Sequence, residues 1–262
     1  LFIINNIMTK VIGIDLGTTF SAIASLDDLG NPEVLTSIED NRKITASAIY
    51  INDKNVVVGD KALNFIATEP NKVILQTKRE MENDVVYSIN KGNWTNDKSD
   101  IESYSPAQVS ALILKKLKEY TSDVKRAVIT VPAMFAERAR QATLEAAKMA
   151  DIEVIELINE PTAAVLHYAS LPGVEIGGRV LIFDLGGGTF DVTIADVKSK
   201  SVDVLTSRGD KYLGGKDFDY EITKLMKKKY QEHHDVEIDI ENNKEYILKA
   251  EEIKKILTVK PE

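Results

Sequence analysis

The chain has 262 residues, of which 44% are hydrophobic and 28% charged, with a formal net charge of −8 and no cysteine. This length suits one or two soluble domains, the acidic balance disfavours nucleic acid as a main partner, and disulfides and thiolate metal sites are excluded. No apolar run reaches the roughly 18 residues of a membrane span, so we expect a cytoplasmic protein without a membrane partner.

Strand patterns dominate the first sixty residues. Residues 10–14 and 20–26 predict two strands on either side of the corner DLGTT. The strand pattern continues at LTSI (35–38), AIYI (48–51) and NVVVG (55–59). A helical segment, DKALNFIAT, is expected after this last run.

The sequence predicts that a helix begins after Ser105, because Pro106 follows it and Gln108 stands three residues later, as in a capping box. Strands alternating with helices over the rest of the chain indicate an α/β fold. The predicted helices cover 106–120, 136–150, 161–168, 216–230 and 244–257, and the predicted strands cover 126–132, 154–158 and 179–185.

One plan occurs twice in the chain. VIGIDLGTTFSAIAS (11–25) and VLIFDLGGGTFDVTIAD (180–196) each have an apolar strand, Asp-Leu-Gly, small and hydroxyl residues, and a second strand. The two copies begin about 170 residues apart. Two corners of one design suggest two lobes with a single site between them.

The two corners combine features that suit a phosphate with features that oppose one. Glycines let backbone amides approach a ligand, and threonine hydroxyls add donors, whereas an aspartate repels phosphate. A divalent cation such as Mg²⁺, held through its waters, removes the conflict. A tight hairpin with an Asx turn remains the alternative for either corner alone. Neither a Walker A loop nor a dinucleotide fingerprint is present.

Five segments in one order resemble the nucleotide-binding domain of the heat-shock-70 (DnaK-type) chaperones, over about residues 10 to 258. The resemblance implies the two-lobed fold of the actin, hexokinase and heat-shock-70 superfamily, with ribonuclease-H-like cores and nucleotide between the lobes. It also implies ATP and ADP as ligands, with Mg²⁺ and K⁺ as candidate cations. The segments are IGIDLGTTFSA, VITVPAMFAERARQAT, LINEPTAAVLHYA, IFDLGGGTFDVTI and YLGGKDFD.

The resemblance assigns roles by position. Lys78 aligns with the catalytic lysine, Glu160 and Asp191 with acids near the metal and the attacking water, and Pro132 and Arg140 with a proline switch and its arginine. Asp15, Asp184 and Glu160 are expected to hold the metal, mostly through water, and Asp184 and Thr189 also act in catalysis. The phosphate loops comprise Asp15, Gly17, Thr18 and Thr19, and Asp184, Gly186, Gly187, Gly188 and Thr189; the adenosine contacts are Glu251, Lys254, Lys255 and Thr258.

We expect lobe I at residues 8–177, with a polar excursion over about 45–102, and a partial lobe II at 178–262. The latter divides into a core part to about 220 and the start of an outer subdomain. Because the resemblance stops there, lobe II is expected to be incomplete, and client peptide is expected to bind only through a domain outside this sequence. J-domain co-chaperones and nucleotide-exchange factors are the implied protein partners.

Two other functions stay open. A different ATPase of the same superfamily, such as a sugar kinase or a filament protein, shares the two corners, although NEPTAA and YLGGKDFD argue against it. A fragment that does not hydrolyse ATP but binds co-chaperones is the other alternative.

Overall fold

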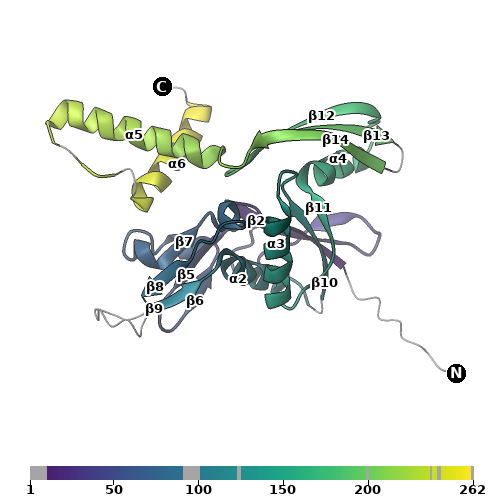
Figure 1. Cartoon of the computed structure of the whole chain (residues 1–262), viewed down its shortest axis with the longest axis horizontal. Helices are drawn as coiled ribbons and strands as arrows, with labels where there is room; N and C mark the ends of the chain where they lie inside the picture. The colour runs from purple at the N-terminus through teal and green to yellow at the C-terminus, as the bar shows by residue number, and fades with distance from the viewer. Residues whose placement is uncertain are drawn as a thin grey trace.

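In the computed structural model, two of the β-sheets lie on either side of one helix (Figure 1), and the sheets β6-β5-β7 and β8-β9 lie apart from them. A large sheet with two helices forms the lower part of that view, and a smaller sheet the upper part. Two further helices extend to one side of the smaller sheet. The structure describes residues 11–90, 101–122, 125–198, 201–236, 238–240 and 243–260.

The large sheet has the strand order β11-β10-β1-β2-β3, and a short strand β4 also pairs with β2. β1 runs antiparallel to β2 and parallel to β10. Its buried side chains alternate along the strand, as expected where one face of a sheet packs on a core. The strands are β1 (Val11–Asp15), β2 (Phe20–Leu26), β3 (Pro32–Val34), β4 (Thr45–Ala46), β10 (Arg126–Val131) and β11 (Glu153–Asn159).

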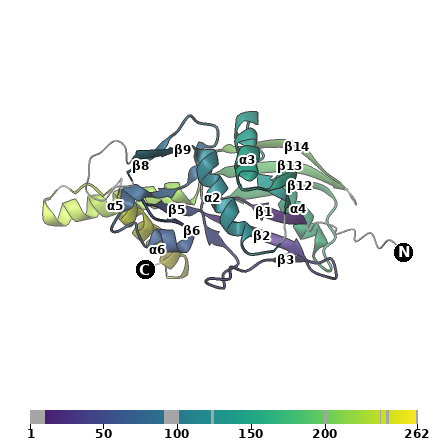
Figure 2. The ribbon, with the colours of Figure 1, turned by 90° about the horizontal axis from the view of Figure 1, so that it is seen from below.

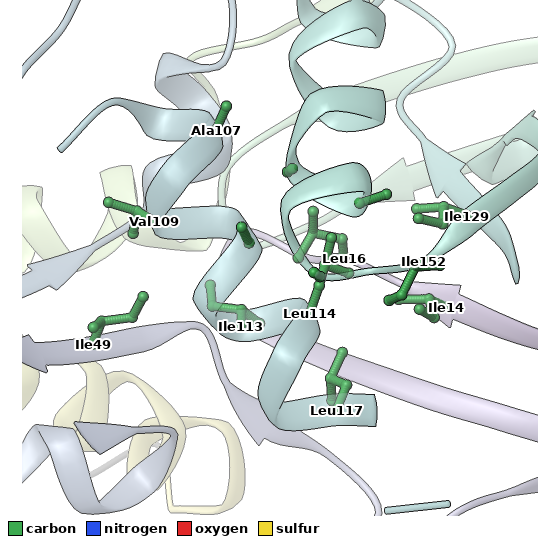
Figure 3. Packing of buried hydrophobic residues seen from close by; sticks show 14 of the residues in the cluster. Ile14, Leu16, Ile49, Ala107, Val109, Ile113, Leu114, Leu117, Ile129 and Ile152 are labelled. Carbon is green, nitrogen blue, oxygen red and sulfur yellow. The ribbon is translucent and has the colours of Figure 1, made fainter. Parts of the chain in front are cut away.

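Helices α2 (Pro106–Lys118) and α3 (Glu137–Met149) pack together against the large sheet (Figure 2). The predicted capping box of α2 is confirmed, because Ser105 Oγ accepts from the Gln108 amide and the Gln108 side chain accepts from the Ser105 amide. Figure 3 shows the apolar stripe of α2, including Leu114 and Leu117, facing side chains of β1 and β10. This stripe holds α2 on the sheet.

The smaller sheet is a meander of β12 (Gly178–Leu185), β13 (Phe190–Lys198) and β14 (Ser201–Asp210). Both pairings are antiparallel, as is the β1–β2–β3 run of the large sheet. The repeat in the sequence is therefore a repeat of structure, with a strand–corner–strand unit opening each sheet. Helix α4 (Glu160–Ser170) contacts both sheets and lies between them (Figure 1).

The remaining elements lie to one side of the two sheets. Helices α5 (Gly215–His234) and α6 (Lys244–Val259) pack on each other, and Leu248 of α6 packs against a separate apolar cluster that includes Tyr50 and Ile66. The other elements there are β5 (Ala48–Ile51), β6 (Val56–Val58), α1 (Asp60–Leu63), η1 (Pro70–Lys72), β7 (Val73–Leu75), η2 (Thr77–Glu80), β8 (Tyr87–Asn90) and β9 (Ile101–Tyr104).

One expectation about local structure is wrong, and another is confirmed only in part. LTSI (35–38) is not a strand: the strand at this place is β3, which ends at Val34, and Ser37 is instead used in the turn that follows. The helix expected after Gly59 has only four residues and continues as turns. Part of the polar excursion, residues 91–100, lies outside the described residues.

Candidate functional site

The first glycine corner joins β1 to β2 and is braced from two sides. The Gly17 amide donates to Ser21 Oγ at 3.2 Å, and the Gly17 carbonyl accepts from Ser47 Oγ at 2.7 Å. A Cβ at Gly17 would lie 2.0 Å from the Phe20 carbonyl oxygen, so the turn is too tight for any other residue. Asp15, at the end of β1, accepts from Thr130 Oγ1 at 3.0 Å on the parallel neighbour β10.

The second corner joins β12 to β13 and touches the first. A Cβ at Gly187 would lie 2.0 Å from Thr19 Oγ1, and one at Gly188 would lie 2.4 Å from Thr18 Cγ2. Both distances are shorter than any that real side-chain atoms keep from a Cβ, so an alanine at either position would clash. The two copies of the repeated motif thus face each other, and the glycines allow the contact.

The carbonyls of the second corner are tied to the start of α5. The Gly215 amide donates to the Gly186 carbonyl and the Lys216 amide to the Gly187 carbonyl, each at 2.9 Å. Among the described residues, the amides of Gly187 and Gly188 have no hydrogen-bond acceptor in the protein. Unused backbone amides on a glycine turn are the donors that a phosphate needs.

Lys78 and Glu160 form an ion pair at this place, although 82 residues separate them. Lys78, in η2, is only 8% exposed, and Glu160 is the first residue of α4. Burial raises the pKa of Glu160; the charge of Lys78 opposes that rise, and the carboxylates of Asp15 and Asp184 add to it. The pair therefore belongs to a cluster in which negative charge exceeds positive charge.

Asp184 and Asp191, which face each other across the β12–β13 hairpin, also have raised pKa values. Burial raises the pKa of both carboxyl groups, and the Asp184 charge raises that of Asp191 further. Asp191 is 3% exposed, and its Oδ1 is buried without a hydrogen-bond partner. Among the residues that the structure describes, no three acidic or histidine side chains are grouped closely enough to hold a metal directly. Crowded carboxylates with an orphaned oxygen fit a cation that is held largely through water.

Most of these residues line a cavity of about 470 Å³, whereas Gly188 and Asp191, which were expected in the site, are not among its lining residues. It contains residues from both glycine corners, from η2 and from α4, so it lies where the two sheets meet. The lining residues are Asp15, Gly17, Thr18, Thr19, Phe20, Lys78, Thr130, Glu160, Ala164, Asp184, Gly186, Gly187 and Thr189.

The residues expected to contact adenosine do not line this cavity. Glu251 pairs with Lys216 at 2.8 Å and with Lys255 at 2.9 Å. Burial alone would raise the pKa of Glu251, but its bonds to these two lysines outweigh burial and lower it. Lys254 pairs with Asp219 at 2.6 Å and donates to the Gly215 carbonyl, next to the second corner.

The last member of this set, Thr258, bonds back to the carbonyl of Lys254 one turn earlier in α6. Glu251 and Lys254 therefore hold α6 on α5, whereas the Lys255 ion pair and the Thr258 hydrogen bond lie within α6 itself. Their contact with adenosine remains a prediction.

Pro132 and Arg140 lie on one chain of contacts that ends beside the cavity. The Pro132 carbonyl accepts from the Phe135 amide, and the Phe135 carbonyl accepts from Arg140 Nε at 3.1 Å. Arg140 also donates to Asn159 Oδ1 at 2.7 Å, and Asn159 immediately precedes Glu160. A physical connection therefore runs from the end of β10 to the acid of α4.

Sequence reasoning missed three residues that line the cavity, Phe20, Thr130 and Ala164. Thr130 was detectable in principle, because it stands at the end of a predicted strand and hydroxyls there often face a site. Its pairing with Asp15 depends on the parallel register of β1 and β10, which no local pattern contains.

The fold and the cavity together define an α/β protein whose polar site is assembled from two glycine-rich hairpin corners. Comparison with known proteins identifies the family: the family model described as Hsp70 protein matches residues 11–260. The chain belongs to the Hsp70 family.

Two relatives named Chaperone protein DnaK illustrate the similarity. The one from Mycoplasmopsis agalactiae is 40% identical over 243 residues, and the one from Thermotoga petrophila is 37% identical over 236 residues. The matches cover 89% and 87% of this chain, but only 37% of each relative. Among the described helices, none is both long and apolar enough to cross a membrane.

Proposed function

We propose that this chain is the nucleotide-binding part of a chaperone and that it binds and hydrolyses ATP between two lobes, at residues 8–177 and 178–262. One observation carries the proposal: both glycine corners, the Lys78–Glu160 pair and the unused amide of Gly187 meet at one cavity. The name of these relatives, Chaperone protein DnaK, agrees with it.

The phosphates are the part of ATP for which the site is best equipped. The Gly187 amide and the hydroxyls of Thr18, Thr19 and Thr189 supply donors from both sides of the cavity, and the unused Gly188 amide lies next to them in the second corner. Thr19 Oγ1 is buried without a partner in the protein, so it is available to a ligand oxygen.

In the proposed reaction a water attacks the terminal phosphate and ADP and phosphate leave. Lys78 places the terminal phosphate and the water, and Glu160 holds Lys78 in position through their ion pair. Thr189 and the amides of the second corner stabilise the charge that develops on the phosphate oxygens.

Asp15, Asp184, Asp191 and Glu160 are the residues that would hold Mg²⁺, with K⁺ as a second candidate. When bound, the cation supplies positive charge to the phosphates and relieves the repulsion among these carboxylates. The raised pKa values of Glu160, Asp184 and Asp191 support this assignment.

For the longer protein we propose the partners that the family implies: J-domain co-chaperones, nucleotide-exchange factors and, through a domain outside this sequence, client peptides. Protein folding under stress in the cytoplasm is the corresponding role. Helix α6 is the proposed adenosine contact, through Glu251, Lys254, Lys255 and Thr258. Its ion pairs with α5 would then have to rearrange when nucleotide binds.

Calorimetric titration with Mg-ATP and Mg-ADP, followed by a phosphate-release assay, tests the proposal. Dissociation constants near ~1 μM, about −8 kcal/mol, together with slow turnover support it. Binding without turnover would indicate a non-hydrolysing interaction module. No binding by a folded chain would contradict nucleotide binding by this chain, and stimulation by a sugar would indicate a sugar kinase.

A further inference from the structure

Arg79 connects two parts of the site that are far apart in the sequence. Its Nε donates to the Gly188 carbonyl at 2.9 Å, and its Nη1 donates to Asp217 Oδ1 at 3.1 Å. Its Nη2 bonds the other oxygen of the same carboxylate. The guanidinium thus uses three donors at once, in the fork geometry that arginine has and lysine lacks.

The bond to Gly188 completes a set. The carbonyls of Gly186 and Gly187 are held by amides at the start of α5, and the carbonyl of Gly188 by Arg79. All three carbonyls of the second corner are therefore occupied from outside the loop. Fixing the Gly186 and Gly187 carbonyls fixes the peptide planes that carry the amides of Gly187 and Gly188, and fixing the Gly188 carbonyl fixes the plane of the Thr189 amide, so Arg79 holds the end of the same loop.

Asp217 serves both sides of this contact. Its Oδ2 accepts the Gly214 amide at 2.7 Å at the start of α5, while both of its oxygens bind Arg79. The Arg79 side chain is 12% exposed and that of Asp217 is 35% exposed, so solvent screens this partly buried pair less than a fully exposed one. A bidentate pair of this kind holds its two partners in one relative position.

Arg79 is the direct sequence neighbour of Lys78, which is a proposed catalytic residue. Its neighbour Lys78, in the same short helix η2, pairs with Glu160 and lines the cavity. One turn therefore carries the lysine that enters the site and the arginine that holds the opposite loop. We call the contacts of Arg79 with Gly188 and Asp217 the Arg79 clamp. The second corner can move relative to Lys78 only if this clamp breaks.

We propose that Arg79 is a positioning residue for hydrolysis, which sets the distance between Lys78 and the amides of the second corner. The proposal rests on the proposed ATPase function. A misplacement of about 1 Å in an active site can cost a factor of ~100 in rate. Because Arg79 is not among the residues that line the cavity, it acts through Gly188 and Asp217.

The test compares Arg79→Ala, Arg79→Lys and a control, Lys211→Ala. Lys211 forms an ion pair with Glu82 close to the clamp in sequence, but it is 46% exposed and touches neither glycine corner. Single-turnover hydrolysis and KM for ATP are measured for each variant, with thermal unfolding to show that each is folded. Ethylguanidinium is then added as a chemical replacement for the missing side chain.

We expect Arg79→Ala to lower kcat by about 10- to 100-fold with KM little changed, because positioning affects the transition state more than binding. Arg79→Lys, which keeps the charge but loses the fork, should lose nearly as much, and Lys211→Ala should match the unaltered chain. Ethylguanidinium should restore part of the activity of Arg79→Ala alone.

Three results overturn the proposal in different ways. If the unaltered chain turns over ATP and Arg79→Lys and Arg79→Ala both match Lys211→Ala, then Arg79 has no positioning role. A proportional loss of kcat and thermal stability in Arg79→Ala, without rescue, leaves only a structural role. If the unaltered chain neither binds nor hydrolyses ATP, the ATPase function itself fails, and with it the role given to Arg79.

Discussion

Gly187→Ala tests the contact between the two glycine corners most directly. The added Cβ would lie 2.0 Å from Thr19 Oγ1 and 3.0 Å from Thr19 Cβ. One corner must retreat or the Thr19 side chain must turn, and overpacking of this kind costs about 1–3 kcal/mol. For a chain of this size each kcal/mol lowers Tm by about 2–4 °C.

Thermal and urea unfolding measure the cost without reference to any ligand. The matched control is Gly13→Ala in β1, where no heavy atom lies within 4 Å of the added Cβ. That substitution should change the free energy of unfolding by no more than about 0.5 kcal/mol. The difference between the two alanines isolates the clash from the general effect of replacing a glycine.

A second substitution identifies the source of the clash. Thr19→Ala removes the oxygen at 2.0 Å, so the double variant Gly187→Ala/Thr19→Ala should recover at least half of the stability that Gly187→Ala loses. Equal stability of Gly187→Ala and Gly13→Ala would refute the contact between the corners. A double variant no better than Gly187→Ala would show that the strain lies elsewhere.

Three further predictions concern single side chains. Lys78→Ala should abolish turnover while calorimetry still detects Mg-ATP, and unchanged turnover would remove Lys78 from the mechanism. Asp191→Asn should stabilise the chain at neutral pH, because the pKa of Asp191 is raised and its ionised form destabilises the fold. That advantage should vanish as pH falls through the raised pKa toward the ordinary value of 3.8, which urea unfolding at several pH values can follow. Ser105→Ala removes the cap of α2 and should cost about 1 kcal/mol in the same assay, and no measurable loss would contradict the importance of the capping box.

Structural features that depend on residues close together in the sequence could be predicted from the sequence. The α2 start at Ser105 is one, because a capping box is a local pattern with a local cause. The two Asp-Gly corners are another, since each strand–turn–strand unit is built within about fifteen residues. Their repetition indicated a shared site before any distance was known, and the structure does bring them into contact.

The clamp could not be found in this way. Arg79 lies 109 residues from Gly188 and 138 from Asp217, and a Lys-Arg pair ahead of acidic residues has no local signature. For Lys216 and Asp219 the local pattern is misleading rather than absent. Their neighbours on α5 suggest a solvated helix face, whereas in the folded chain both are buried and pair with Glu251 and Lys254 of α6.

The distance in sequence between the two corners also sets the order in which the site can form during synthesis. At roughly 5–20 residues per second, the ribosome needs on the order of 10–30 s to extend the chain from Thr19 to Gly187. The large sheet, with β1, β2, β10 and β11 all before residue 160, can close within that interval. The first corner, with its hydrogen bonds to Ser21 and Ser47, can therefore form before the second corner and Asp217 have been synthesised. The proposed phosphate site is therefore completed in one late step, because a nascent chain halted before residue 188 lacks Gly188, Thr189 and Asp217.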